Sequence, residues 1–85
     1  MDDETVAFVK RSQYRQRVLK SLEDDVLMPK QIAERSDIKV NHVSKVLSEL
    51  KSKDLIEIIN PEMRKGRLYR QTDNGKIVSK NISIE

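Results

Sequence analysis

Residues 40–52, with the sequence VNHVSKVLSELKS, decide the fold of this chain. The apolar residues of this stretch recur at spacings of three and four, and they are Val43, Val46, Leu47 and Leu50. This spacing is typical of one face of an α-helix with 3.6 residues per turn. The opposite face carries the polar residues Asn41, Lys45, Ser48 and Ser52. The stretch therefore predicts an amphipathic helix with one buried face and one polar face.

A shorter helix is expected just before this one, and it begins at Pro29. Proline suits the first turn of a helix because its missing N–H would have no partner there. Ile32 and Ala33 are the inward residues of this helix, and Ser36 and Asp37 end it. Only a short break separates the two helices.

After residue 52 the period of the apolar pattern changes from that of a helix to that of a strand. Residues 55–59 are rich in β-branched side chains and are bounded by Asn60-Pro61, which predicts a strand. Residues 61–66 form a polar, basic loop, and residues 67–71 form the return strand. The hydroxyl of Thr72 is expected to cap a last short helix. The inward residues of that helix are expected to be Ile77, Val78 and Ile82.

At the start of the chain we expect a single helix from about Thr5 to Glu23. At about 100° per residue, one stripe of this helix contains Ala7, Tyr14, Val18 and Leu22. Val6 and Val9 then fall on its outer face. Residues 1–4 are acidic and are expected to be a disordered tail, which leaves residues 5–85 as one domain. The apolar residues 26–28 suggest a brief strand.

Length and composition restrict the class of protein. The chain has 85 residues, whereas an ordinary domain has roughly 100–200, so one small domain of the α+β class, mainly α, is expected. The absence of Cys excludes a disulfide scaffold, and a single His without Cys excludes a zinc site. No arrangement of residues predicts an enzyme or a cofactor. No apolar run is long enough for a membrane span or a signal peptide, so we expect a cytoplasmic protein.

Charge is distributed unevenly along the chain. The net charge is +3, but residues 5–85 alone carry 17 basic and 11 acidic residues, a net charge of +6. A basic balance in so small a domain indicates a polyanion as partner. A well-solvated surface accounts for the same charge, so charge alone does not decide between the two interpretations.

Four stretches together resemble a known family. They are residues 29–38 (PKQIAERSDI), 41–50 (NHVSKVLSEL), 54–57 (DLIE) and 66–75 (GRLYRQTDNG). From about Tyr14 to Ile82, the order helix, helix, helix, hairpin, helix resembles the winged helix-turn-helix domain of MarR-, ArsR- and PadR-like transcription regulators. Asp54 stands where the family often has glycine, and no glycine occurs near Asp37. Asp tolerates the left-handed conformation better than most residues, so the turn at Asp54 is expected to form.

The resemblance implies a double-stranded DNA partner. Residues 40–52 would be the recognition helix in the major groove, and the basic wing, residues 60–70, would contact the backbone or the minor groove. Asn41 has the chemistry to pair with adenine, and Lys45 has the reach to contact guanine or a phosphate. The full set of candidate DNA-binding residues is Lys30, Lys39, Asn41, His42, Ser44, Lys45, Ser48, Arg64, Lys65, Arg67 and Arg70.

The leading hypothesis is a DNA-binding transcriptional regulator. The alternatives are a winged-helix module for protein–protein interaction and a chromatin-like protein that coats DNA without sequence preference. A homodimer is a separate hypothesis, because spare apolar residues occur near both ends of the chain. Those residues are Val6, Phe8, Val9, Ile77, Ile82 and Ile84. Packing of the terminal helices onto the core accounts for them equally well.

Overall fold

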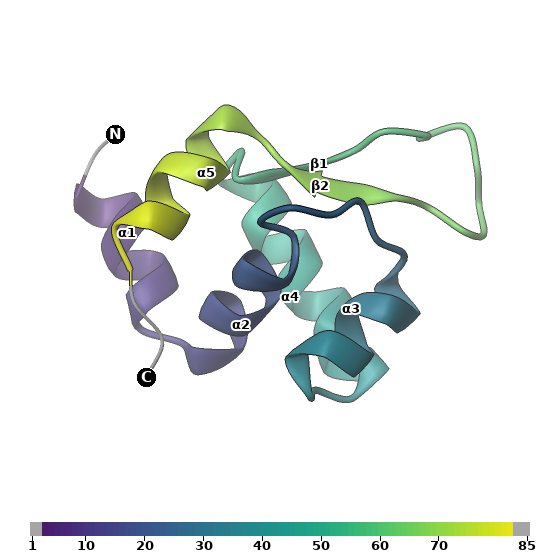
Figure 1. Ribbon diagram of the computed structural model, residues 1–85, viewed down its shortest axis with the longest axis horizontal. Coiled ribbons are helices and arrows are strands. Elements are labelled where there is room, and N and C mark those ends of the chain that lie inside the picture. The colour runs from purple at the N-terminus through teal and green to yellow at the C-terminus, as the bar shows by residue number, and fades with distance from the viewer. Residues whose placement is uncertain (1–2, 83–85) are drawn as a thin grey trace.

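The computed structural model describes residues 3–82, which contain five helices and a two-stranded hairpin (Figure 1). The elements are α1 (Asp3–Lys10), α2 (Gln13–Ser21), α3 (Pro29–Ser36), α4 (Val40–Ser52), β1 (Ile56–Ile58), β2 (Tyr69–Gln71) and α5 (Asp73–Lys80). The hairpin projects from the helices at the end of the long axis opposite α1 (Figure 1). This order agrees with the α+β, mainly helical fold class expected from the sequence.

Helices α3 and α4 begin where the sequence predicts them to begin. Pro29 is the first residue of α3, and α4 runs from Val40 to Ser52 as expected. The apolar face of α4 is buried, and its residues are Val43, Val46, Leu47 and Leu50. Because α4 packs against both α2 and α3, this face forms the centre of the core.

Helices α3 and α4 end in the same way, with an aspartate in the left-handed conformation. Asp37 has φ 56° and Asp54 has φ 58°. The following residues, Ile38 and Leu55, are buried, and each donates its amide hydrogen to the carbonyl five residues earlier at 3.1 Å. This arrangement is a Schellman motif, which usually has glycine at the left-handed position. The prediction that Asp54 accepts this conformation is confirmed.

The hairpin is short and is joined to the helices by a third segment. Strands β1 and β2 pair antiparallel, with Ile58 opposite Tyr69. Leu27 and Tyr69 then exchange two backbone hydrogen bonds, of 3.1 and 2.9 Å. The brief strand expected at residues 26–28 is therefore a single bridge at Leu27. Both hairpin strands have three residues, fewer than the sequence pattern predicts.

The junction between the wing and α5 is tightly packed. The hydroxyl of Thr72 accepts a hydrogen bond from the Gly75 amide at 3.0 Å, which confirms the predicted cap. The same hydroxyl donates to the Asp54 carbonyl at 2.6 Å. A Cβ atom added to Gly75 would lie 2.0 Å from the Leu55 carbonyl oxygen. Only glycine fits at this position.

The single first helix predicted from the sequence is wrong, because the chain turns between α1 and α2. The side chain of Ser12 accepts a hydrogen bond from the Arg15 amide at 3.2 Å and so caps a new helix. The turn folds α1 back, and Val9 is 0% exposed instead of lying on an outer face. Helix α1 begins at Asp3, so Asp3 and Glu4 belong to its first turn. Met1 and Asp2 lie outside the described residues.

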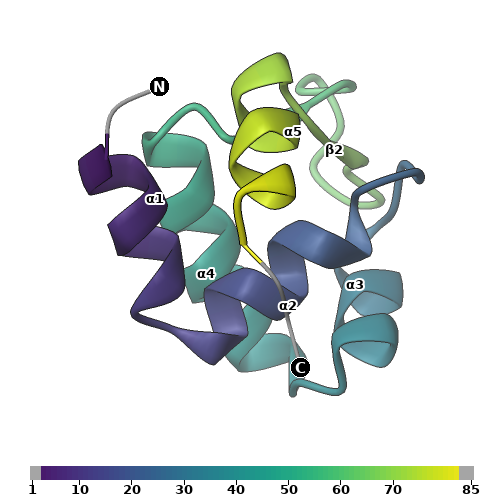
Figure 2. The same cartoon turned by 60° about the vertical axis from the view of Figure 1, so that its left-hand side comes forward.

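Two apolar residues that were expected to face inward are exposed. Tyr14 is 41% exposed and Ile77 is 45% exposed. The other inward residues expected in and after α5, Val78 and Ile82, are buried. Helix α5 packs on α2 and on β2 (Figure 2), and eight residues present only a narrow stripe to these neighbours.

Candidate nucleic-acid interface

The outward face of α4 is an exposed polar surface. Asn41, Ser44, Lys45 and Ser48 are all exposed. At about 100° per residue, these four side chains spread over roughly a quarter to a third of the helix circumference. Among the described residues, no hydrogen bond or ion pair is made by the side chains of Asn41 and Lys45. This face therefore offers an amide, hydroxyls and an ammonium to a partner.

His42 lies on the flank of α4 that faces α2. Its ring packs against the ring of Tyr14 on α2, with 5.7 Å between the centroids and a tilt of 60°. A step of about 100° separates His42 from Asn41 around the helix. His42 is exposed, but it lies beside the polar face rather than in its centre. Tyr14 thus packs against α4 at the surface, not inside the core.

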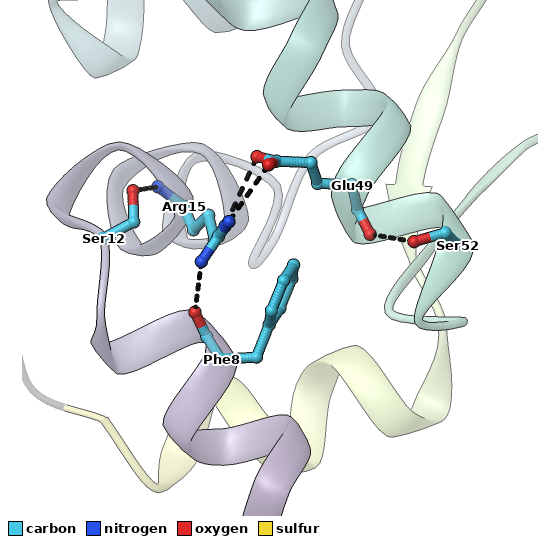
Figure 3. A network of polar contacts seen from close by, with 5 residues as sticks. All are labelled: Phe8, Ser12, Arg15, Glu49 and Ser52. Atoms are coloured by element: carbon cyan, nitrogen blue, oxygen red, sulfur yellow. Dashed lines mark hydrogen bonds and ion pairs between the residues drawn. The ribbon is translucent and has the colours of Figure 1, made fainter.

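One arginine fixes α4 relative to the first two helices (Figure 3). The guanidinium of Arg15 donates to both carboxylate oxygens of Glu49, at 3.3 and 3.0 Å. It also donates to the Phe8 carbonyl at 2.8 Å and lies 3.8 Å from the centroid of the Phe8 ring. Because Phe8 belongs to α1, Arg15 to α2 and Glu49 to α4, this one side chain joins three helices.

The pKa of Glu49 is lowered from its ordinary value. The main cause is the hydrogen bond from Arg15. Partial burial opposes the effect, whereas the positive charges of Arg15 and Lys45 add to it. The only acidic residue between Lys39 and Ser52 is thus held as a carboxylate and paired with Arg15 of α2, at the edge of the polar face beside Lys45.

The first turn of α4 is open and contains an exposed apolar residue. Lys39, at the N-cap, is exposed and makes no side-chain cap hydrogen bond. Val40, the first residue of the helix, is 51% exposed. The Ser44 hydroxyl donates to the Val40 carbonyl at 3.3 Å, so it keeps its lone pairs as acceptors. Sequence reasoning did not include Val40 among the candidate residues. Val40 precedes Val43 and Leu47 by three and seven residues, and this spacing predicts that it is buried with them. The sequence pattern therefore does not indicate that Val40 is exposed.

The loop of the wing is held together by Asn60. Its amide nitrogen donates to the Gly66 carbonyl at 3.1 Å, and its amide oxygen accepts from the Leu68 amide at 2.7 Å. Arg64 and Lys65 lie in the loop between these contacts and are exposed. The side chain of Arg67 folds back, and its Nε donates to the Met63 carbonyl at 2.6 Å.

Arg70 is separate from the cations of the wing loop. Its Nε donates to the Glu57 carboxylate at 2.7 Å across the hairpin. It lines two surface hollows together with acidic residues from other elements, and these are Glu23, Asp24, Asp25, Asp54, Glu57 and Asp73. The structure therefore groups Arg64 and Lys65 on the loop and places Arg70 in acidic surroundings. Lys30, the second residue of α3, is exposed.

The residues expected to form a dimer contact do not share one exposed surface. Val9 and Ile82 are buried, and Val6 and Phe8 pack against the core. The expectation that Val9 and Ile82 are available to a second chain is therefore wrong, because both complete the core of their own chain. Ile77 remains exposed. Ile84 lies outside the described residues.

Residues 3–82 contain neither a metal-binding cluster nor a membrane-spanning helix. No group of three or more His, Asp or Glu side chains in this part of the chain is placed to hold a metal ion. None of the helices described is long and apolar enough to cross a membrane.

The arrangement of helices and hairpin occurs in known proteins. The fold is a winged helix. It matches a MarR family regulator from Neisseria meningitidis with a TM-score of 0.74 and 26% identity, over 93% of this chain and 57% of that one. MarR from E. coli gives a TM-score of 0.74 and 21% identity, over 93% and 60% of the two chains. Lactococcus lactis ZitR in complex with DNA gives 0.70 and 21%, over 81% and 48%.

The similarity lies in the fold and covers part of each known structure. The chain spans about half the length of the solved structures ZitR and the Silicibacter pomeroyi regulator, 49% and 55%. No protein-family model and no curated protein matches the sequence.

Proposed function

We propose that this chain is a sequence-specific double-stranded DNA-binding domain that acts in transcriptional regulation. In this proposal, the polar face of α4 enters the major groove, and the wing contacts the phosphate backbone or the adjacent minor groove. The observation that carries the proposal is the polar face of α4, on which the exposed side chains of Asn41 and Lys45 make no hydrogen bond or ion pair with any described residue. The major groove of B-DNA is wide enough for a helix, and amide and ammonium groups read base edges there.

The charge distribution supports the same orientation. Arg64 and Lys65 are adjacent on the wing loop, where the nearest acidic residue in the sequence is Glu62. The loop is held by the side chain of Asn60, so the two cations are positioned before a partner arrives. Positive groups on a projecting, ordered loop suit a polyanion. ZitR, a structure of the same fold, has been solved in complex with DNA.

The six side chains that belong to the proposed contact differ in role. Asn41 would read a base edge, most simply adenine through its amide, and Lys45 would contact guanine or a phosphate. Lys39 and Lys30, near the starts of α4 and α3, would contact phosphates, as would Arg64 and Lys65. Arg70 does not belong to this set, because Glu57 already pairs with it.

The test is a salt titration of binding to a labelled duplex selected from a random library. Each phosphate contact contributes about −0.9 to the slope of log affinity against log salt. The double variant Arg64→Ala/Lys65→Ala should flatten the slope by up to about 1.8, which corresponds to two contacts. Asn41→Ala should reduce the preference for the selected duplex over a scrambled one and leave the slope unchanged.

A matched control is provided by the adjacent cations Lys10 and Arg11. Both are exposed, and they lie at the end of α1 and just beyond it, away from the wing (Figure 1). Lys10→Ala/Arg11→Ala removes the same charge as the wing variant but should leave the slope within about 0.5 of the wild type. No binding to any duplex at low salt would reject the proposal. Equal binding to selected and scrambled duplexes would favour coating of DNA over regulation.

A homodimer remains part of the proposal, with Ile77 as the only exposed member of the expected set within residues 3–82. Sedimentation at high concentration, with and without the duplex, tests it. A strict monomer under both conditions would remove the dimer from the proposal without affecting DNA binding.

A further inference from the structure

The first residue of α4 does not contribute to the core. Val40 is 51% exposed, the largest exposed fraction among the exposed apolar residues of residues 3–82. The remaining apolar residues of α4 are buried. Val40 is therefore the only exposed valine, leucine or isoleucine on this helix.

Val40 lies next to the polar face of α4 and not on the flank that contacts α2. At about 100° per residue, Ser44 lies about 40° and Asn41 about 100° from Val40 around the helix, while His42 and Glu49 lie about 160–200° away. The Ser44 hydroxyl donates to the Val40 carbonyl, so these two residues form one edge of the face. Val40 therefore lies on the rim of the face that a duplex contacted by Asn41 and Ser44 would cover, between Ser44 and the buried Leu47.

The chemistry of the major groove explains which group a branched apolar side chain would meet. Base edges in this groove present hydrogen-bond donors, hydrogen-bond acceptors and one apolar group, the 5-methyl of thymine. Of these groups, only the 5-methyl gains from contact with the two methyls of valine. Such a contact removes apolar surface of the thymine and of the valine from water, which is favourable. The N-terminal residues of a recognition helix are those that approach base edges.

We propose that Val40 is a specificity-determining residue that contacts the 5-methyl group of a thymine in each bound site. The inference rests on the proposed function, and it adds a preference for thymine that hydrogen bonding from Asn41 does not provide. It also predicts that the selected duplex contains a thymine whose methyl group, rather than its hydrogen-bonding atoms, is required for full affinity.

The test removes the methyl group from the DNA and the side chain from the protein. Each thymine of the selected duplex is replaced in turn by deoxyuridine, which lacks only the 5-methyl group. At one position the wild type should lose about fourfold in affinity, the effect of one buried methyl group. Val40→Ala should bind the thymine duplex about fourfold to tenfold more weakly than the wild type. It should bind the thymine and deoxyuridine duplexes equally.

The control is Val26→Ala, because Val26 is 43% exposed and lies in the segment before α3. This variant should bind like the wild type and should keep the fourfold effect of deoxyuridine. Two results would overturn the inference while leaving the proposed function intact. One is that no deoxyuridine substitution weakens binding, and the other is that the substitution weakens Val40→Ala as much as the wild type. Failure of the wild type to bind any duplex would overturn both proposals.

Discussion

Replacement of Gly75 by alanine should destabilise the fold strongly, although it adds only one methyl group. A Cβ atom at this position would lie 2.0 Å from the Leu55 carbonyl oxygen, whereas real Cβ contacts essentially never fall below 3.0 Å. The two groups must therefore separate by at least 1 Å. That carbonyl accepts a hydrogen bond from the Thr72 amide at 3.1 Å, so a shift of this size breaks the bond or moves α5.

The magnitude follows from these contacts. An orphaned carbonyl costs about 1–3 kcal/mol and strained packing about 1–3 kcal/mol, while alanine regains about 1 kcal/mol of helix propensity. The expected loss is about 3 kcal/mol, which lowers the melting temperature by about 12–24 °C in a domain of this size. Urea and thermal denaturation followed by circular dichroism measure both quantities.

Gly66 is the matched control, because it is the only other glycine in the chain. Its φ is +70°, and a Cβ atom there would meet only the sulfur of Met28 at 3.8 Å, an ordinary contact. Gly66→Ala should therefore cost only the strain of the left-handed conformation, about 1 kcal/mol. If Gly75→Ala is no more destabilising than Gly66→Ala, the reasoning from close approach is wrong.

Three further predictions concern separate parts of the molecule. Glu49→Gln should cost about 1 kcal/mol at pH 7. Because the folded-state pKa of Glu49 is lowered, its stabilisation is present above the unfolded pKa of about 4.3 and is lost as pH falls through the folded value. Urea denaturation at several pH values should thus show the two proteins converging below pH about 4; a constant difference would contradict this. Asp37→Gly should raise the free energy of unfolding by about 0.5 kcal/mol, since glycine relieves the strain of the left-handed conformation. Thermal denaturation measures this change, and a less stable variant would contradict the prediction. Asn60→Ala should speed hydrogen exchange at the Leu68 amide about tenfold, since the hydrogen bond of that amide to Asn60 is lost. The Ile32 amide in α3, which donates to the Met28 carbonyl, is the control and should exchange at an unchanged rate.

The parts of the fold that the sequence predicts well are those with strong local signals. Helix α4 has a regular apolar face. Within a helix, Pro29 is tolerated only in the first turn. Thr72 stands three residues before Gly75, the spacing that a side-chain cap requires. Each signal acts within a few residues, so tertiary contacts do not override it.

The errors arise where the direction of the chain depends on distant contacts. The break before α2 has a local signal, the cap at Ser12, but the apolar periodicity continues through it and suggests one helix. The burial of Val9 follows from this turn and not from the sequence around it. Ile77 and Val78 are adjacent in a short helix, and only the position of α2 decides which of them is buried.

The candidate site shows the same division. The exposure of Asn41 and Lys45 was expected from the period of α4 and is found in the structure. The pairing of Arg70 with Glu57 depends on the register of the hairpin, which the sequence does not specify. The exposure of Val40 depends on where the neighbouring helices end, so a periodic pattern could not reveal it.

The bridge between Leu27 and Tyr69 bears on how this chain and a DNA duplex would fit together in the proposed complex. Leu27 lies two residues before α3, so its paired backbone bonds to Tyr69 tie the base of the wing to the start of the helix pair. The spacing between the base of the wing and α3 is therefore set during folding. A duplex that contacts both, as proposed, would have to match this spacing, and it would bend or change its groove width wherever its own geometry differs. Its flexibility would then affect affinity at base pairs that no side chain touches.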